Sequence, residues 1–135
     1  MSKKKRKKTA NGADPFAMAS KAIDKFASEV GHFMDYLARP RCYISGGIAH
    51  YDLEERKAAF GRAAEELDKA GYLPINPFHN GVPQTAHFTK HMRKDIAMLL
   101  ECDYIYMLKG WELSKGAKLE LDVASSCGIK VLFQK

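Results

Sequence analysis

The chain has 135 residues, of which 46% are hydrophobic and 28% are charged, and this suits one domain with a single core. Its formal net charge of +6 equals the charge of the basic run Lys3–Lys8. Removing those six residues leaves 16 of the 22 basic residues against 16 acidic ones. The basic character therefore belongs to a tail, which argues against a basic binding face on the folded domain.

Membrane insertion and secretion are not supported by the sequence. No apolar run approaches the ~20 residues that a membrane span needs, and the basic start is not followed by a signal-peptide apolar region. Three cysteines, Cys42, Cys102 and Cys127, are widely spaced among apolar or small residues, which is typical of buried thiols in a reducing compartment. These features predict a cytoplasmic protein that makes no membrane contact.

The first third of the chain contains a tail and a helix. Residues 1–13 have the composition of a disordered basic tail. Residues 14–38 are expected to form a helix, because apolar residues from Phe16 to Leu37 recur at three- and four-residue steps. This helix precedes the first strand, so it is an addition to the core, and it could pack on the sheet or pair with a second subunit.

Residues 39–135 alternate between predicted strands and helices. Strands are expected at 42–45, 72–76, 103–108 and 130–133, with helices at about 52–70, at 89–101 and from Ser114. Pro74 favours an edge position for the second strand, and Gly71 is expected to close the helix before it. The pattern predicts a single α/β domain with a parallel sheet of about four strands and flanking helices, Rossmann- or flavodoxin-like, plus the extra N-terminal helix.

Polar groups are expected to converge at one edge of this sheet. Strand carboxyl ends and the amino ends of the following helices meet there, so residues 43–47, residues 111–114 and Glu120 should share a cleft. Gly116 and Ala117 would leave space beside Glu120 on its helix. The pattern alone slightly favours another interpretation, in which the small residues serve close packing and Glu120 lies in solvent.

Two further carboxylates differ in how well the pattern places them. Asp103 begins its strand and is expected at the opposite edge of the sheet, capping a turn. Asp95 lies in the middle of a helix, and the pattern does not determine where its side chain goes.

Other kinds of chemistry are less well supported. His87 and His91 stand four residues apart, but a zinc site needs a third ligand and usually an acidic partner between them, so no metal is predicted. No serine lies in a nucleophile elbow, and no cysteine has a histidine partner within a motif. Gly46-Gly47 forms a turn where backbone could approach a ligand closely, but it is neither a dinucleotide-binding fingerprint nor a Walker loop.

Four segments resemble the nucleoside 2-deoxyribosyltransferase superfamily, and more narrowly its small phage and bacterial branch of unknown function (DUF4406-like). The segments are YISGGIA (43–49), GYLPINP (71–77), MRKDIAMLLECDYIYMLKGWE (92–112) and SKGAKLELDVA (114–124). Their order and spacing carry the resemblance, which spans about residues 42–133.

The resemblance implies an α/β fold and cleavage of a glycosidic bond without a cofactor. Glu120 matches the residue that attacks the anomeric carbon of the sugar, and Tyr43 matches the tyrosine that orients it. Asp95, eight residues before Asp103, matches the aspartate that assists the departing base. Together they imply a covalent glycosyl-enzyme that is released by water or by a second base.

Ser114 bears on the substrate. Family members that act on free nucleosides have Asp six residues before the nucleophile, whereas members that hydrolyse nucleoside 5′-monophosphates have Ser there. A hydroxyl and the amides of Lys115 and Gly116 at a helix start would accept a phosphate that Asp would repel, and Lys109 or Lys115 could add charge. The other expected substrate contacts are Ser45, Gly46, Gly47 and Trp111.

One departure and three hypotheses remain. Ile48, Ala49 and His50 follow the two glycines, where some nucleotide-hydrolysing members have a basic residue.

The first hypothesis is an N-glycosidase or deoxyribosyl transferase acting on a nucleoside 5′-monophosphate. The second is a non-catalytic nucleotide-binding or sensing module. The third is a protein tethered to nucleic acid by weak, non-specific contacts of Lys3–Lys8. The resemblance also implies a homodimer, because family sites are often completed by a second subunit.

Overall fold

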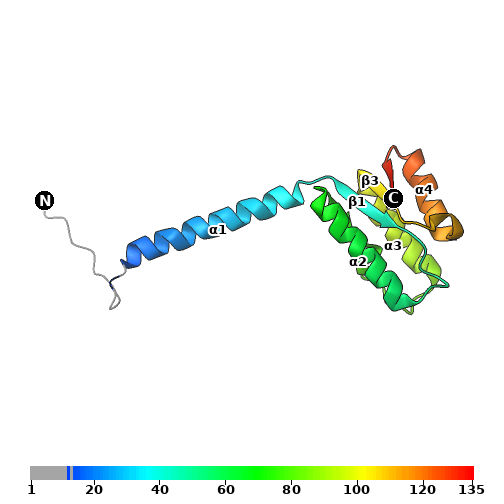
Figure 1. Cartoon of the computed structure of the whole chain (residues 1–135), viewed down its shortest axis with the longest axis horizontal. Coiled ribbons are helices and arrows are strands. Elements are labelled where there is room, and N and C mark those ends of the chain that lie inside the picture. Colours follow the sequence, from blue (N-terminus) through cyan, green and yellow to red (C-terminus); the bar gives the residue numbers. More distant parts are fainter. Residues whose placement is uncertain (1–11, 13) are drawn as a thin grey trace, which may run out of the picture. The chain divides into compact units, whose positions relative to one another are not determined.

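The computed structural model describes Gly12 and residues 14–135 and divides the chain into two units, with the boundary between Ala38 and Arg39. The first contains one helix, α1 (Pro15–Leu37), and the second is an α/β unit (Figure 1). Asp14 caps α1 by accepting a hydrogen bond from the amide of Phe16, and Pro15 takes the first helical position. The predicted disorder of residues 1–13 falls almost wholly outside the described residues.

Four parallel strands form the sheet of the α/β unit in the order β2-β1-β3-β4. The strands are β1 (Arg41–Ser45), β2 (Leu73–Ile75), β3 (Tyr104–Met107) and β4 (Lys130–Phe133). The predicted fold class is confirmed, and so is the edge position of β2, where Pro74 is tolerated. Because the chain builds outward from β1 in both directions, the carboxyl ends of β1 and β3 flank a topological switch point, where such folds bind ligands.

Helices cover both faces of the sheet, and the alternation of β1 decides which side chain meets which layer. Helix α2 (Leu53–Lys69) packs on one face, where Cys42 and Ile44 meet Phe60 in one core cluster. Helices α3 (Phe88–Leu100) and α4 (Lys115–Ser126) cover the other face, where Tyr43 joins a second cluster. Successive residues of a strand point to opposite faces, so Tyr43 and Ser45 are both directed toward α4.

Several helix and strand ends lie where the sequence predicted them. The hydroxyl of Ser114 accepts a hydrogen bond from the amide of Ala117 at 3.1 Å and caps α4. Gly71 follows α2 with a φ of 95°, the left-handed conformation expected of a glycine closing a helix. Asp103 accepts from the amide of Arg41 at 3.3 Å, at the amino edge of the sheet as expected. Two short 3₁₀ helices, η1 (Pro77–His79) and η2 (Trp111–Leu113), lie in the loops before α3 and α4.

The three cysteines do not share one environment. Cys42 and Cys102 are buried, as the sequence predicted, but the prediction that Cys127 is buried is wrong. Cys127 is the residue that ends α4, and it faces solvent because the helix stripe that meets the sheet stops at Ala124. In the described part of the chain, no helix is long and apolar enough to cross a membrane.

Neighbouring leucines on α3 offer a matched test of this core. Leu99 is fully buried, whereas Leu100 is 52% exposed. We expect Leu99→Ala to lower the free energy of unfolding by about 2–5 kcal/mol, because it removes buried apolar surface and leaves a cavity. Leu100→Ala should change it by about 0.5 kcal/mol or less. Urea unfolding monitored by circular dichroism measures both values, and equal losses would contradict this assignment of the core.

Candidate active site

A cavity of about 390 Å³ opens at the carboxyl edge of the sheet. Its walls come from the loop after β1, the loop that contains η1, the first turns of α3 and the start of α4. Seven residues predicted from the sequence line it: Gly46, Gly47, Asp95, Ser114, Lys115, Gly116 and Glu120. The structure thus brings together groups that lie up to 74 residues apart in the chain, from position 46 to position 120.

Glu120 is the most deeply held carboxylate of the cavity. Its side chain is buried, the Tyr43 hydroxyl donates a hydrogen bond to Oε2, and the Ser45 hydroxyl donates to Oε1 at 2.9 Å. Ala117, Glu120 and Ala124 form the buried stripe of α4 at three- and four-residue spacing, so a carboxylate stands where an apolar side chain is usual. The interpretation that placed Glu120 in solvent is wrong.

Burial and the two hydroxyl donors act on Glu120 in opposite directions. Burial raises the pKa of this carboxyl, the hydrogen bonds from Tyr43 and Ser45 lower it, and the nearby charge of Asp95 raises it. The net effect is a pKa raised from 4.5 to about 7. Burial also raises the pKa of Tyr43 well above 10, so its hydroxyl stays a donor. The site therefore holds a carboxyl group that titrates close to neutrality.

Asp95 belongs to a polar network on the α3 side of the cavity. Asn80 donates a hydrogen bond to Asp95 Oδ1 at 2.9 Å, and the same amide nitrogen lies 3.2 Å from His91 Nδ1. The other ring nitrogen of His91 lies 3.0 Å from the carbonyl of Pro83, which ties the loop to the helix. Burial raises the pKa of Asp95, and the bond from Asn80 lowers it. Asp95 also lines the cavity, so its carboxyl group can meet a ligand there.

Sequence reasoning did not identify Asn80. The spacing from Asn80 to Asp95 is not a local motif, so nothing in the sequence pointed to this pair. Asn80 is buried although it lies in a loop, because the amide of Val82 donates to its side-chain oxygen at 2.9 Å while its nitrogen reaches α3.

Arg56 was also missed, and it bears on the absence of a basic residue after the two glycines. Its guanidinium is buried in the second turn of α2, where Nε donates to the carbonyl of Gly47 at 2.7 Å. The same group lies 4.5 Å from the centre of the Tyr51 ring. Arg56 does not line the cavity, so it acts as a positioning residue that holds the glycine turn from behind.

The two glycines of this turn are required by close contacts. A Cβ on Gly46 would lie 3.0 Å from the Cβ of Leu108, and one on Gly47 would lie 2.9 Å from the Tyr51 ring. A larger residue at either position would push the turn away from β3 or from Tyr51. The turn therefore needs glycines for space against Leu108 and Tyr51, whereas the sequence explained them by close approach of the backbone to a ligand.

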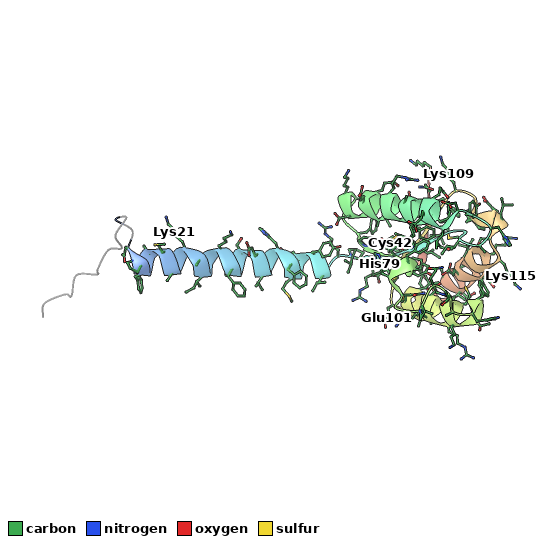
Figure 2. The ribbon with its side chains drawn as sticks, turned by 90° about the horizontal axis from the view of Figure 1, so that it is seen from below. Lys21, Cys42, His79, Glu101, Lys109 and Lys115 are labelled. Carbon is green, nitrogen blue, oxygen red and sulfur yellow. The ribbon has the colours of Figure 1, made fainter. Side chains whose placement is uncertain are left out.

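Other predicted contacts lie outside the cavity lining. Trp111 packs on Phe133, with 6.0 Å between ring centres, and joins the α4 side of the core instead of lining the cavity. Tyr43 and Ser45 reach the site only through Glu120. Lys109 does not line the cavity, whereas Lys115 lines its rim at the start of α4 and lies at the surface (Figure 2).

Metal ligation has no support in the described part of the chain, where no group of three His, Cys, Asp or Glu side chains is placed to hold an ion. The two histidines four residues apart have different tasks. His87 caps α3 by accepting from the amide of Thr89 at 3.2 Å, and His91 belongs to the Asn80 network.

An α/β fold of this kind, with a carboxylate at the switch point of a parallel sheet, is the nucleoside 2-deoxyribosyltransferase-like fold. A solved structure titled "2-desoxiribosyltransferase from Leishmania mexicana" superposes with a TM-score of 0.54 at 24% identity, over 70% of this chain and 63% of that one. A conserved protein from Enterococcus faecalis V583 superposes with a TM-score of 0.55 at 22% identity, over 71% of this chain and 63% of its own. The chain therefore spans less than two thirds of the length of each of these structures.

Residues 40–133 match a family described as "Domain of unknown function (DUF4406)", and the chain belongs to this family. No curated protein matches the sequence significantly. The predicted resemblance is confirmed at the level of the family and the fold. The roles of individual residues rest on the geometry described above.

The buried carboxyl of Glu120 should also make the free energy of unfolding depend on pH. Its pKa is raised from 4.5 to about 7, so this group stabilises the fold fully below pH 4.5 and loses that contribution as the pH rises through about 7. In Glu120→Gln the side chain cannot ionise, so this loss of stability at high pH does not occur. We expect its free energy of unfolding, relative to wild type, to be greater at pH 8 than at pH 5 by roughly 1–3 kcal/mol.

Urea unfolding of both proteins at the two pH values measures this difference. Asp122→Asn is the matched control, because Asp122 is an exposed carboxylate on the same helix and should give the same difference at both pH values. A Glu120→Gln difference that does not change with pH would show that Glu120 keeps an ordinary pKa.

Proposed function

We propose that this protein cleaves the N-glycosidic bond of a (deoxy)nucleoside 5′-monophosphate, with Glu120 as the nucleophile. The observation that carries the proposal is the buried carboxylate of Glu120, held at both oxygens by Tyr43 and Ser45 beside a cavity at the switch point. Two fixed hydrogen bonds orient a carboxylate for attack without the cost of ordering it during the reaction. The fold, which a deoxyribosyltransferase shares, supports the same reaction class.

Two carboxyl groups would divide the chemistry. Ionised Glu120 attacks the anomeric carbon and forms a C–O bond while the C–N bond to the base breaks, its electron pair passing to the base. Protonated Asp95 on the facing helix gives its proton to the departing base, and its raised pKa favours that protonated form. Water or a second base then attacks the sugar carbon and frees Glu120, which yields hydrolysis or transfer.

The start of α4 suits the phosphate. The first amides of a helix have no partner within the helix and carry a partial positive charge, which favours a phosphate near Lys115 and Gly116. Ser114 accepts from Ala117 at its oxygen, so its own hydroxyl proton remains free to be donated to a phosphate oxygen. Lys115 adds a positive charge at the rim of the cavity.

The first test is chromatography of the purified protein after incubation with a panel of ribo- and deoxyribonucleoside 5′-monophosphates and the matching nucleosides. We expect free base from at least one monophosphate. Glu120→Ala should reduce its release by at least about 10³-fold, because it removes the proposed nucleophile. Asp122→Asn, an exposed carboxylate on the same helix, should release base at the wild-type rate.

The outcomes of this test separate the hypotheses. Base release that survives in Glu120→Ala would contradict the assignment of the nucleophile. Binding of a monophosphate without turnover, measured by calorimetry on the wild-type protein, would instead support a nucleotide-binding or sensing module.

Ser114 provides a test of substrate class with a matched pair of variants. Both Asp and Asn cap helices well, so Ser114→Asp and Ser114→Asn should both keep the start of α4 folded. Only the Asp variant adds a negative charge beside the expected phosphate. We expect Ser114→Asp to lower kcat/KM for monophosphates by about 10²-fold or more relative to Ser114→Asn, while nucleoside cleavage is not lowered. Equal values for the two variants would mean that no phosphate sits at this helix start.

A further inference from the structure

Seven apolar residues of α1 recur at a strict heptad spacing. Steps of three and four residues alternate without a break, and this 3.5-residue period is typical of a helix that supercoils with another helix. We call these seven residues the seam: Phe16, Ala19, Ile23, Phe26, Val30, Phe33 and Leu37.

The large side chains of the seam from Ile23 to Leu37 are exposed on the helix unit. No residue of α1 is buried, and Ile23, Phe26 and Phe33 are 67%, 68% and 58% exposed. Aromatic rings run along the side of α1 away from Lys21, which occupies the heptad position opposite the seam (Figure 2). An isolated helix with a glycine at position 31 and β-branched residues in its seam is marginal in water, so α1 needs a partner along this side.

The length of the seam indicates what that partner is. Helix α1 has 23 residues and is ~35 Å long, whereas the longest helix of the α/β unit has 17 residues and measures ~25 Å. The longest strand has five residues, or ~17 Å. No element of the described α/β unit is as long as the seam, but α1 of another copy matches it in length and in period.

Area and charge agree with such a pair. The exposed parts of the seam side chains amount to roughly 600 Å² per helix, or about 1,200 Å² for two helices, which reaches the lower end of stable interfaces.

The polar side of α1 carries two basic residues, Lys21 and Lys25, and three acidic ones, Asp24, Glu29 and Asp35. A membrane-surface helix usually has an excess of basic residues there, so these charges favour a protein partner.

We propose that α1 pairs with α1 of a second copy through the seam, as a coiled coil that joins two α/β units into a dimer. The Lys25–Glu29 pair lies on the outer side of the helix at 4.0 Å and stays solvated in this arrangement. The proposal is independent of the chemistry at Glu120, since every residue lining the cavity in the described chain lies between Gly46 and Glu120.

Sedimentation equilibrium of the full chain over a range of micromolar concentrations tests the proposal. The wild-type protein is expected at twice the mass of the 135-residue chain. Phe26→Glu with Phe33→Glu places two charges in the seam and should raise the dimer dissociation constant by roughly 100-fold or more. The control, Ser28→Glu with His32→Glu, adds two charges to exposed positions outside the seam and should leave the protein dimeric.

Two further measurements keep the test decisive. The unfolding midpoint of the α/β unit should be the same in the seam and control variants at protein concentrations where both are folded, while helix content by circular dichroism falls only in the seam variant. A monomeric wild type, or seam and control variants of equal mass, overturns the proposal. The proposal is also overturned if the protein is a monomer that binds vesicles of phosphatidylserine and phosphatidylcholine only when the seam is intact. It is likewise overturned if the protein is a monomer whose α/β unit is destabilised by the seam substitutions.

Discussion

The hydrogen bonds that join Glu120 to Tyr43 and Ser45 connect the middle of the sheet to the helix at its switch point. They cross 77 and 75 residues of sequence, and they leave the carboxylate, at 5% exposure, with both oxygens satisfied. Removing either hydroxyl would leave a buried charge with one donor fewer, which costs more than the bond itself contributes. This pair of bonds explains why a carboxylate can stand in the buried stripe of α4.

Satisfying the hydrogen bonds does not remove the electrostatic cost of burying the charge. Asp95 faces the same cavity from α3, and its charge makes the ionised form of Glu120 less favourable. In general, two carboxyl groups close together favour a state in which one is ionised and the other is protonated. Cleavage of a glycosidic bond uses that state, with one carboxylate ionised for attack and one carboxyl group protonated for the leaving base. The raised pKa of Glu120 would thus link the stability of the folded protein to the proposed chemistry.

The sequence was informative wherever one short segment contains the whole cause. Ser114 as a helix start, Gly71 as a helix end and Pro74 as an edge residue all act over a few residues. Residues whose role depends on a distant partner were missed or misplaced. Arg56 holds a carbonyl nine residues away, and Asn80 bridges a loop to a helix. Trp111 was expected at the substrate, but it finds a larger apolar surface against Phe133.

The period of α1 carries information that the positions of its apolar residues alone do not. A helix that packs on a sheet needs only a broad apolar side. Small departures from an average apolar repeat of 3.5 residues therefore cost it little stability. Two long helices that stay in contact must keep the seam facing the partner over every turn, which an unbroken alternation of three and four achieves. From Phe16 to Leu37 the alternation has no break, and no residue of α1 is buried. Assembly through α1 and chemistry at Glu120 would then be set by separate parts of the chain, so a substitution in the seam can change the first without touching the second.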